Sequence, residues 1–217
     1  MTLAPPELEL LTAYLECMLE TGSHTNLTAV RDAPEAWMRH FFDALSLVPF
    51  IEPAQSLMDI GTGAGIPGMV LAICRPDCSF TLVDAVDKKC RFLAEVAEKL
   101  TISNVTVLHA RAEDVGRDLT LRESSDLVLA RAVSELAVLL EFCLPLVKVG
   151  GRFLAMKGER YRDELEAAAG AMQALEIGAP EVHPAVSGPG AQLIFTKELP
   201  TPDRFPRRAG MPKKRPL

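Results

Sequence analysis

The chain has 217 residues, 48% of them hydrophobic and 24% charged, with a formal net charge of −6 at pH 7. This length and balance fit one ordinary globular enzyme domain and exclude a disordered or fibrous chain. No apolar run reaches the ~18 residues that a membrane span needs, and the first nine residues lack a basic start and a long apolar core, so neither a membrane span nor a signal peptide is expected.

Two helices are predicted at the N-terminus. Apolar side chains recur at helical spacing over residues 7–20, and Gly22 is a plausible end for this helix. Asp32 can cap a second helix that has Pro34 in its first turn. The apolar stripe of that helix is Trp37, Phe41, Ala44 and Val48. Residues 1–50 are therefore expected to form a helical appendage.

From residue 55 the pattern becomes an alternation of strands and helices. Strands are predicted at 55–60, 79–84, 104–108, 126–130 and 151–156, and helices at 67–75, 87–100, 133–147 and 160–174. Such alternation predicts a mostly parallel, doubly wound Rossmann-like sheet, with a ligand beyond the carboxyl ends of its strands. Residues 175–186 and 191–198 flank a short Gly/Pro turn and must pair antiparallel. A terminal antiparallel hairpin is typical of class I S-adenosylmethionine-dependent methyltransferases, here expected over 51–200.

A glycine-rich loop follows the first strand, and it predicts a cofactor cradle. Gly63, Gly65 and Gly68 form a GxGxxG pattern, and Asp84 ends the next strand, where an acid that binds ribose belongs. Taken alone, these features fit NAD and S-adenosylmethionine equally. Asp59 before the glycines can face the cationic amino end of S-adenosylmethionine but would repel a pyrophosphate. Little sequence remains for the substrate domain of a dehydrogenase. S-adenosylmethionine is therefore favoured, with an NAD-dependent oxidoreductase as the alternative.

The segment after the fourth predicted strand bears on the chemistry. It contains neither an Asn/Asp-Pro-Pro-aromatic motif, which serves exocyclic amines, nor a Pro-Cys nucleophile, and it presents Arg131. A guanidinium stays protonated, so Arg131 is predicted to position a ligand and not to act as a base. An aromatic ring nitrogen with a free lone pair would need no base. The competing interpretation is that Arg131 forms an interface salt bridge.

Neither the cysteines nor any other cluster predicts a metal site. Cysteines 17, 74, 78, 90 and 143 are scattered and odd in number. They are expected to be buried, small apolar residues in a reducing compartment, the cytoplasm.

The C-terminal segment 201–217 is strongly basic. Between residues 204 and 217 there are six basic residues and no acids, which leaves a charge of −12 on the rest of the chain. An acidic body with a basic tail predicts contact with a polyanion at one place. The alternative is a solvated, disordered terminus.

Together these motifs resemble the bacterial 16S ribosomal RNA guanine-N7 methyltransferases, the glucose-inhibited division protein B family. The resemblance covers nearly the whole chain and rests on Asn26-Leu27-Thr28-Ala29, Arg39-His40-Phe41 with Asp43 and Leu45, Asp59-Ile60-Gly61-Thr62-Gly63-Ala64-Gly65 with Pro67-Gly68, Leu82-Val83-Asp84 with Lys88-Lys89, Arg111-Ala112-Glu113, Ala130-Arg131-Ala132-Val133, Lys157-Gly158 and the tail from Arg207 to Leu217.

The resemblance implies methyl transfer from S-adenosylmethionine to N7 of a guanine near the decoding centre, in 16S rRNA, the small subunit or its assembly intermediate. It implies cofactor contacts at Gly61, Ile66, Ala112, Glu113 and Arg131. Nothing in the sequence demands more than a monomer. A ribosome-binding factor without catalytic activity is the remaining alternative.

Basic residues outside the cofactor motifs are candidate RNA contacts, each competing with an ordinary solvated face. They are Arg39, His40, Lys88, Lys89, Lys157, Arg207, Arg208, Lys213 and Lys214. Lys88 and Lys89 begin a predicted helix, where positive charge opposes the helix dipole, and this placement favours a phosphate partner.

Overall fold

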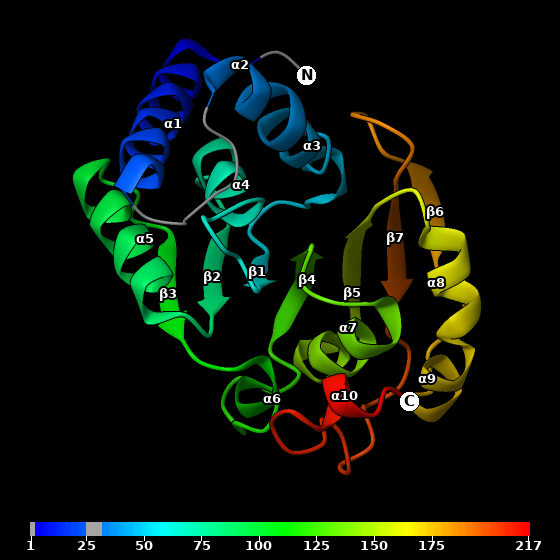
Figure 1. The fold of residues 1–217 in the computed structure, drawn as a ribbon. Helices are drawn as coiled ribbons and strands as arrows, with labels where there is room; N and C mark the ends of the chain where they lie inside the picture. The colour runs from blue at the N-terminus through cyan, green and yellow to red at the C-terminus, as the bar shows by residue number, and fades with distance from the viewer. Residues whose placement is uncertain (1–2, 25–31) are drawn as a thin grey trace.

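A computed structural model describes residues 3–24 and 32–217 (Figure 1). Its centre is a seven-stranded sheet of order β3-β2-β1-β4-β5-β7-β6. β1 to β5 pair in parallel, whereas β7 is antiparallel to β5 and to β6. This confirms the predicted doubly wound sheet with a terminal antiparallel hairpin. The strands are β1 Ser56–Ile60, β2 Ser79–Asp84, β3 Val105–His109, β4 Ser125–Arg131, β5 Val147–Lys157, β6 Glu181–Pro184 and β7 Ala191–Thr196.

Helices cover both faces of the sheet. Side chains alternate along each strand, so Leu57 of β1 joins one apolar cluster while Met58 and Ile60 join the other. The first cluster is closed by α1 Pro5–His24, α4 Gly68–Cys74 and α5 Asp87–Lys99, and the second by α6 Ala112–Val115, α7 Leu136–Cys143, α8 Tyr161–Ala167 and α9 Ala169–Ala174.

The N-terminal helices differ in detail from the prediction. α1 continues through Gly22 to His24, because one glycine costs a helix only about 1 kcal/mol and packing of the apolar face outweighs it. Asp32 caps the next segment as predicted, accepting from the N–H of Glu35 at 3.3 Å. That segment is not one helix but α2 Ala33–Ala36, a π-helical turn η1 Trp37–Phe41, α3 Phe42–Leu45 and a 3₁₀ turn η2 Val48–Phe50. The motif 26–29 lies outside the described residues.

Several predicted boundaries also move. The helix predicted at 133–147 begins only at Leu136, and residues 144–146 form a 3₁₀ turn, η3 Leu144–Leu146, around Pro145. The helix at 160–174 divides into α8 and α9. The strand at 175–186 shortens to β6, since Glu176 has a φ of +57° and Pro180 cannot donate to a ladder.

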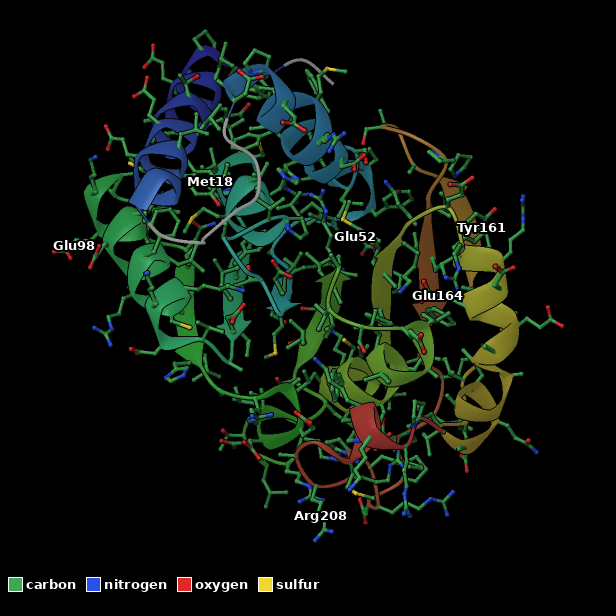
Figure 2. The ribbon with its side chains drawn as sticks, viewed as in Figure 1. Met18, Glu52, Glu98, Tyr161, Glu164 and Arg208 are labelled. Carbon is green, nitrogen blue, oxygen red and sulfur yellow. The ribbon has the colours of Figure 1, made fainter. Side chains whose placement is uncertain are left out.

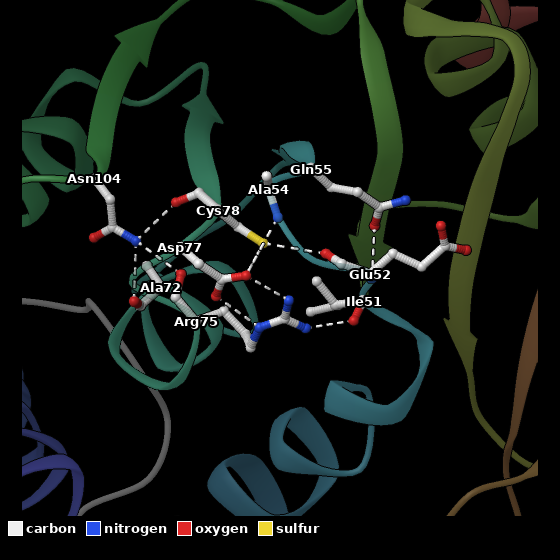
Figure 3. Close-up of polar contacts among 9 residues, drawn as sticks. All are labelled: Ile51, Glu52, Ala54, Gln55, Ala72, Arg75, Asp77, Cys78 and Asn104. Carbon is white, nitrogen blue, oxygen red and sulfur yellow. Dashed lines mark hydrogen bonds and ion pairs between the residues drawn. The ribbon is translucent and has the colours of Figure 1, made fainter.

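The amino ends of the strands are closed by a polar network away from the carboxyl edge (Figure 3). Nδ2 of Asn104 donates to the carbonyl oxygens of Ala72, Arg75 and Cys78 at 3.0–3.1 Å. Arg75 binds both carboxylate oxygens of Asp77 at 2.8 and 2.9 Å, and it holds the pKa of that carboxyl well below its usual range. These contacts fix the turn between α4 and β2.

The C-terminal segment is packed on the molecule and ends in α10 Met211–Lys214, which lies against α7 (Figure 1). Phe205, Pro206 and Pro212 are buried. The alternative of a solvated, disordered tail is therefore wrong. The division into segments 1–50, 51–200 and 201–217 stays a prediction. All five cysteines are buried and free, as predicted.

Candidate functional site

The loop after β1 turns tightly because its glycines adopt left-handed conformations. Gly61, Gly63 and Gly65 have φ of +69°, +63° and +97°, values that residues with a Cβ rarely adopt. A Cβ on Gly61 would lie 2.5 Å from Cγ2 of Val133, a stiff β-branched side chain. The loop can therefore press closely against the segment after β4 only because it is built of glycine.

Asp59 braces this loop from behind. Oδ2 of Asp59 accepts hydrogen bonds from Oγ1 of Thr62 at 2.7 Å and from the N–H of Gly68 at 2.9 Å. Oδ1 is buried without a hydrogen-bond partner among the described residues. Burial raises the pKa of Asp59 to about 6. Asp59 lines neither of the two pockets described next, so it would act on a cationic ligand across the loop and not by the direct contact that the sequence suggested.

Tyr14 gives the loop a second brace, from α1. Its hydroxyl donates to the carbonyl oxygen of Ala64, and the side chain is fully buried. A Cβ on Gly65 would lie 2.7 Å from that hydroxyl oxygen. The N-terminal helices are therefore part of what shapes the cradle.

A pocket of about 320 Å³, here named the Asp84 pocket, opens beyond the carboxyl ends of β1, β2 and β3. Four residues predicted as cofactor contacts meet in its lining: Gly61, Asp84, Ala112 and Glu113. The rest of the wall is largely apolar and includes Ile60, Val83, Val86, Ala110, Val133 and Phe142. An apolar lining with a few polar groups suits a purine nucleoside.

The carboxylates of the Asp84 pocket are held in place by neighbouring groups. Oδ2 of Asp84 accepts from the N–H of Gly63 at 2.9 Å and lies 3.5 Å from Nζ of Lys89. Oε1 of Glu113 accepts from the N–H of Gly210 at 2.8 Å. Lys89, predicted as an RNA contact, thus stands at the rim of this pocket, paired with an acid.

A second pocket, of about 270 Å³, lies against the glycine loop and is named the loop pocket. Gly63, Ile66 and Arg131 line it. Nη2 of Arg131 donates to the carbonyl oxygen of Arg39 and to Nδ1 of His40, both at 2.7 Å. Nη1 is buried without a hydrogen-bond partner in the described part of the chain. This arrangement is not the interface salt bridge considered from the sequence, and it leaves the NH2 group at Nη1 without a partner among the described residues.

His40 is arranged to serve Arg131 as an acceptor. Burial, and next the charge of Arg131, lower the pKa of His40. The neutral imidazole is therefore favoured, and only the neutral ring can accept at Nδ1.

A third pocket, of about 510 Å³, lies beyond the ends of β4 and β5 and is named the Lys157 pocket. Nζ of Lys157 is 2.9 Å from the carbonyl oxygen of Ser134 and 2.5 Å from Oε2 of Glu164. Figure 2 labels Glu164 on α8. Only 8% of the Lys157 side chain is exposed. Lys157 therefore has an internal role, which argues against the predicted phosphate contact. Across the pocket, Oδ1 of Asp43 accepts from the N–H of Ser187 at 3.2 Å.

The three pockets meet at Ala132, which lines all of them. Its φ of +54° is in the left-handed region, which costs a residue with a Cβ about 1–2 kcal/mol. Such strain persists where the surrounding structure enforces it, typically at functional sites. Arg131 lines both the loop pocket and the Lys157 pocket, so the junction is where two ligands can meet.

Four of the remaining predicted RNA contacts lie on the surface. The side chain of Arg39 is 70% exposed and pairs with Glu35 at 3.1 Å. Lys88 lines a surface pocket beside α5. Arg208 and Lys214 are exposed, and Figure 2 shows Arg208 reaching away from the body of the molecule.

The structure places the last two predicted RNA contacts at an internal ion pair and at the Asp84 pocket. Arg207 is paired with the buried carboxylate of Glu141 at 2.6 Å, so its charge is neutralised inside the protein. Lys213 lines the Asp84 pocket.

Sequence reasoning missed several lining residues. Phe142 and Gly210 line the Asp84 pocket and Glu164 the Lys157 pocket, but no local motif marks them. Asp43 and Val133 also line pockets, but the sequence analysis names them only within the motifs that carry the family resemblance. A charged residue inside an otherwise apolar element, such as Glu141 in α7, is a signal that could have pointed to the packing of the tail.

The sheet also separates the two cofactor hypotheses. A dinucleotide-binding sheet continues with parallel strands, and a dehydrogenase adds a substrate domain, whereas here the sheet continues with the antiparallel strand β7 and ends at β6. Within residues 3–24 and 32–217, no group of three or more His, Cys, Asp or Glu side chains could hold a metal ion. No helix in those ranges is long and apolar enough to cross a bilayer.

Comparison with solved structures identifies the fold. A precorrin-6y C5,15-methyltransferase from Geobacter metallireducens matches with a TM-score of 0.53 and 15% identity, over 71% of this chain and 85% of that chain. A SAM-dependent methyltransferase from Aquifex aeolicus matches with a TM-score of 0.56 and 17% identity, over 76% and 95%. The fold is that of the class I S-adenosylmethionine-dependent methyltransferases.

Comparison with sequences identifies the family. The profile described as rRNA small subunit methyltransferase G matches residues 7–191. The ribosomal RNA small subunit methyltransferase G of Moorella thermoacetica is 41% identical over 222 residues, covering 100% of this chain and 92% of that protein. Its counterpart in Chloroflexus aggregans is 46% identical over 208 residues, covering 94% and 87%. With the loop, the pockets and the sheet order in agreement, the chain belongs to the rRNA small subunit methyltransferase G family.

Proposed function

We propose that this protein transfers a methyl group from S-adenosylmethionine to N7 of a guanine in 16S rRNA. The observation that carries the proposal is the meeting of three pockets at Ala132, with Arg131 between two of them. The relatives are named as methyltransferases of small-subunit ribosomal RNA. The choice of N7 comes from the family resemblance, and the chemistry of the junction agrees with it.

The first two pockets fit the cofactor. The largely apolar Asp84 pocket suits adenosine, and Asp84 lines it, so its carboxylate can accept from ribose hydroxyls. Arg131 lines the adjoining loop pocket, and its Nη1 has no hydrogen-bond partner in the described part of the chain. Its guanidinium can bind the carboxylate of the methionine portion. When bound, S-adenosylmethionine supplies an electrophilic methyl group on a sulfonium.

The Lys157 pocket is the proposed site of the target base. It is larger than the other two, and it joins them at Ala132. The carboxylate of Asp43 faces this pocket, and guanine offers two N–H donors on its Watson–Crick edge, opposite N7. We assign Asp43 to recognition of that edge. A carboxylate there would also stabilise the cationic purine that methylation at N7 produces.

The side chains at the junction favour an acceptor that needs no base. Arg131 stays protonated, Nδ1 of His40 accepts a hydrogen bond from Arg131, and Lys157 is paired with Glu164. N7 of guanine has an in-plane lone pair and no proton to lose. Catalysis then rests on holding the two ligands in line and on electrostatics.

The test is methyl transfer from labelled S-adenosylmethionine to 16S rRNA and to 30S particles by the purified protein, followed by mass mapping of the product. The proposal expects N7-methylguanine, and expects Asp43→Ala to lose transfer while binding S-adenosylhomocysteine normally. RNA binding without methyl incorporation would instead support a non-catalytic ribosome-binding factor. Incorporation at another atom would show that the acceptor assignment is wrong.

A further inference from the structure

The C-terminal segment is seated on α7 by a buried ion pair. Glu141 has 0% exposure in a helix that is otherwise apolar. Its carboxylate accepts from the backbone N–H of Arg207 at 2.8 Å and from Nε and Nη2 of the Arg207 guanidinium at 2.6–3.1 Å. Breaking a buried pair by removing one partner leaves an uncompensated charge. Glu141 therefore fixes where the tail lies.

Two further arginines bind the backbone of the segment that precedes Arg207. Arg122 donates to the carbonyl oxygens of Thr201 and Phe205, both at 2.7 Å, and Nε of Arg117 donates to that of Pro206 at 3.0 Å. The Phe205 side chain is buried. These hydrogen bonds to its backbone carbonyls show that the tail is an ordered part of the fold and not a loose basic extension.

The seated tail reaches the cofactor site. The N–H of Gly210 donates to Oε1 of Glu113 at 2.8 Å, and Glu113 is only 4% exposed. Gly210 and Lys213 both line the Asp84 pocket. The tail thus reaches the Asp84 pocket, and its helix α10 lies against α7 (Figure 1).

We propose that residues 204–217 form the outer wall of the S-adenosylmethionine site. Lys213 contacts the bound nucleoside, Gly210 holds Glu113 in place, and the Arg207–Glu141 pair positions both. This inference concerns only the binding of the cofactor, so its test does not depend on which RNA base is methylated. Among the basic residues of the tail, Arg207 and Lys213 then serve the cofactor site. Lys213, Arg208 and Lys214 are all exposed, but only Lys213 lines the Asp84 pocket.

The chain offers two matched pairs of variants for the test. Lys213→Ala and Arg207→Ala alter residues of the proposed wall, whereas Lys214→Ala and Arg208→Ala remove a neighbouring exposed charge of the same kind. The readout is the affinity for S-adenosylhomocysteine in calorimetry, without RNA, with each variant checked by its melting curve.

The proposal expects Arg207→Ala to weaken binding roughly tenfold, Lys213→Ala to weaken it by a smaller but measurable factor, and the two controls to bind like the parent. If Arg207→Ala fails to fold, the affinity of Lys213→Ala for S-adenosylhomocysteine is the deciding measurement. Equal affinity in Lys213→Ala, Lys214→Ala and the parent would overturn the proposal. So would a matched loss of RNA affinity in both lysine variants with no change in cofactor affinity, because the tail would then be an RNA arm only.

Discussion

Two buried side-chain atoms, Nη1 of Arg131 and Oδ1 of Asp59, have no hydrogen-bond partner within residues 3–24 and 32–217. A buried donor or acceptor without a partner costs about 1–3 kcal/mol, so such atoms persist where a ligand compensates for them. A methionine zwitterion carries the two charges that would do so, one by contact with Arg131 and one across the loop from Asp59.

Removal of Arg131 tests the first of these atoms. Arg131→Ala removes a charge-assisted hydrogen bond worth roughly 1.5–3 kcal/mol, so the affinity for S-adenosylhomocysteine should fall by about 10- to 100-fold. Arg131→Lys keeps the charge but loses the planar fork and should restore only part of the affinity. Calorimetry measures both, and an unchanged affinity in a folded Ala variant would refute this role.

The pH dependence of cofactor binding tests Asp59. With a pKa of about 6, the group is about nine-tenths ionised at pH 7 and about one-tenth ionised at pH 5. Binding of the cationic ligand should therefore weaken as the pH falls across this interval. Asp59→Asn should bind more weakly at pH 7 and lose this part of the dependence, and His40, which also titrates, is present in both proteins as the control. Parallel pH profiles would contradict the assignment.

The same pKa has a consequence for stability. Since burial raises the pKa of Asp59, the folded chain holds more protons at this group than the unfolded chain between about pH 4 and 6. This group therefore lowers the stability as the pH rises through that interval. Asp59→Asn should flatten this part of the stability profile in urea titrations.

Among the elements, the two ends of the strands have different tasks. The carboxyl ends open into three pockets, while the turn before β2 at the amino ends is closed by Asn104 and Arg75 (Figure 3). A change at the amino end should therefore alter stability without altering the site.

Asn104→Ala tests this separation. Loss of three hydrogen bonds to the carbonyls around the α4–β2 turn should lower the free energy of unfolding by about 1–3 kcal/mol. Affinity for S-adenosylhomocysteine per folded molecule should not change. Ser103→Ala, at the exposed neighbouring position, is the control and should change neither quantity. A loss of affinity in Asn104→Ala at full folding would mean that the two ends are coupled.

The sequence predicted the elements better than their contacts. Strands β1, β2 and β4 were predictable because their apolar residues are buried on both faces and lead into recognisable loops. The divided helix at residues 33–45 was not, since the run Trp37 to Phe41 reads as a regular stripe while its packing produces a π-helical turn. Likewise, spacing placed Asp84, Glu113 and Arg131 at one sheet edge but could not show Asp59 behind the loop.

For the whole molecule, the site is assembled from both ends of the chain. Tyr14 and Asp43 come from the N-terminal helices, and Gly210 and Lys213 come from the C-terminal segment. The basic composition of that segment predicted contact with RNA, but composition cannot show that Arg207 is neutralised by Glu141. Such pairing joins residues 66 positions apart and depends on the finished fold.

Mass mapping of 16S rRNA from a strain that lacks this protein tests the central proposal most directly. N7-methylguanine should be missing from one site near the decoding centre, should return with the wild-type gene, and should not return with Arg131→Ala or Asp43→Ala. An unchanged N7-methylguanine content in the strain without the gene would contradict the proposed function.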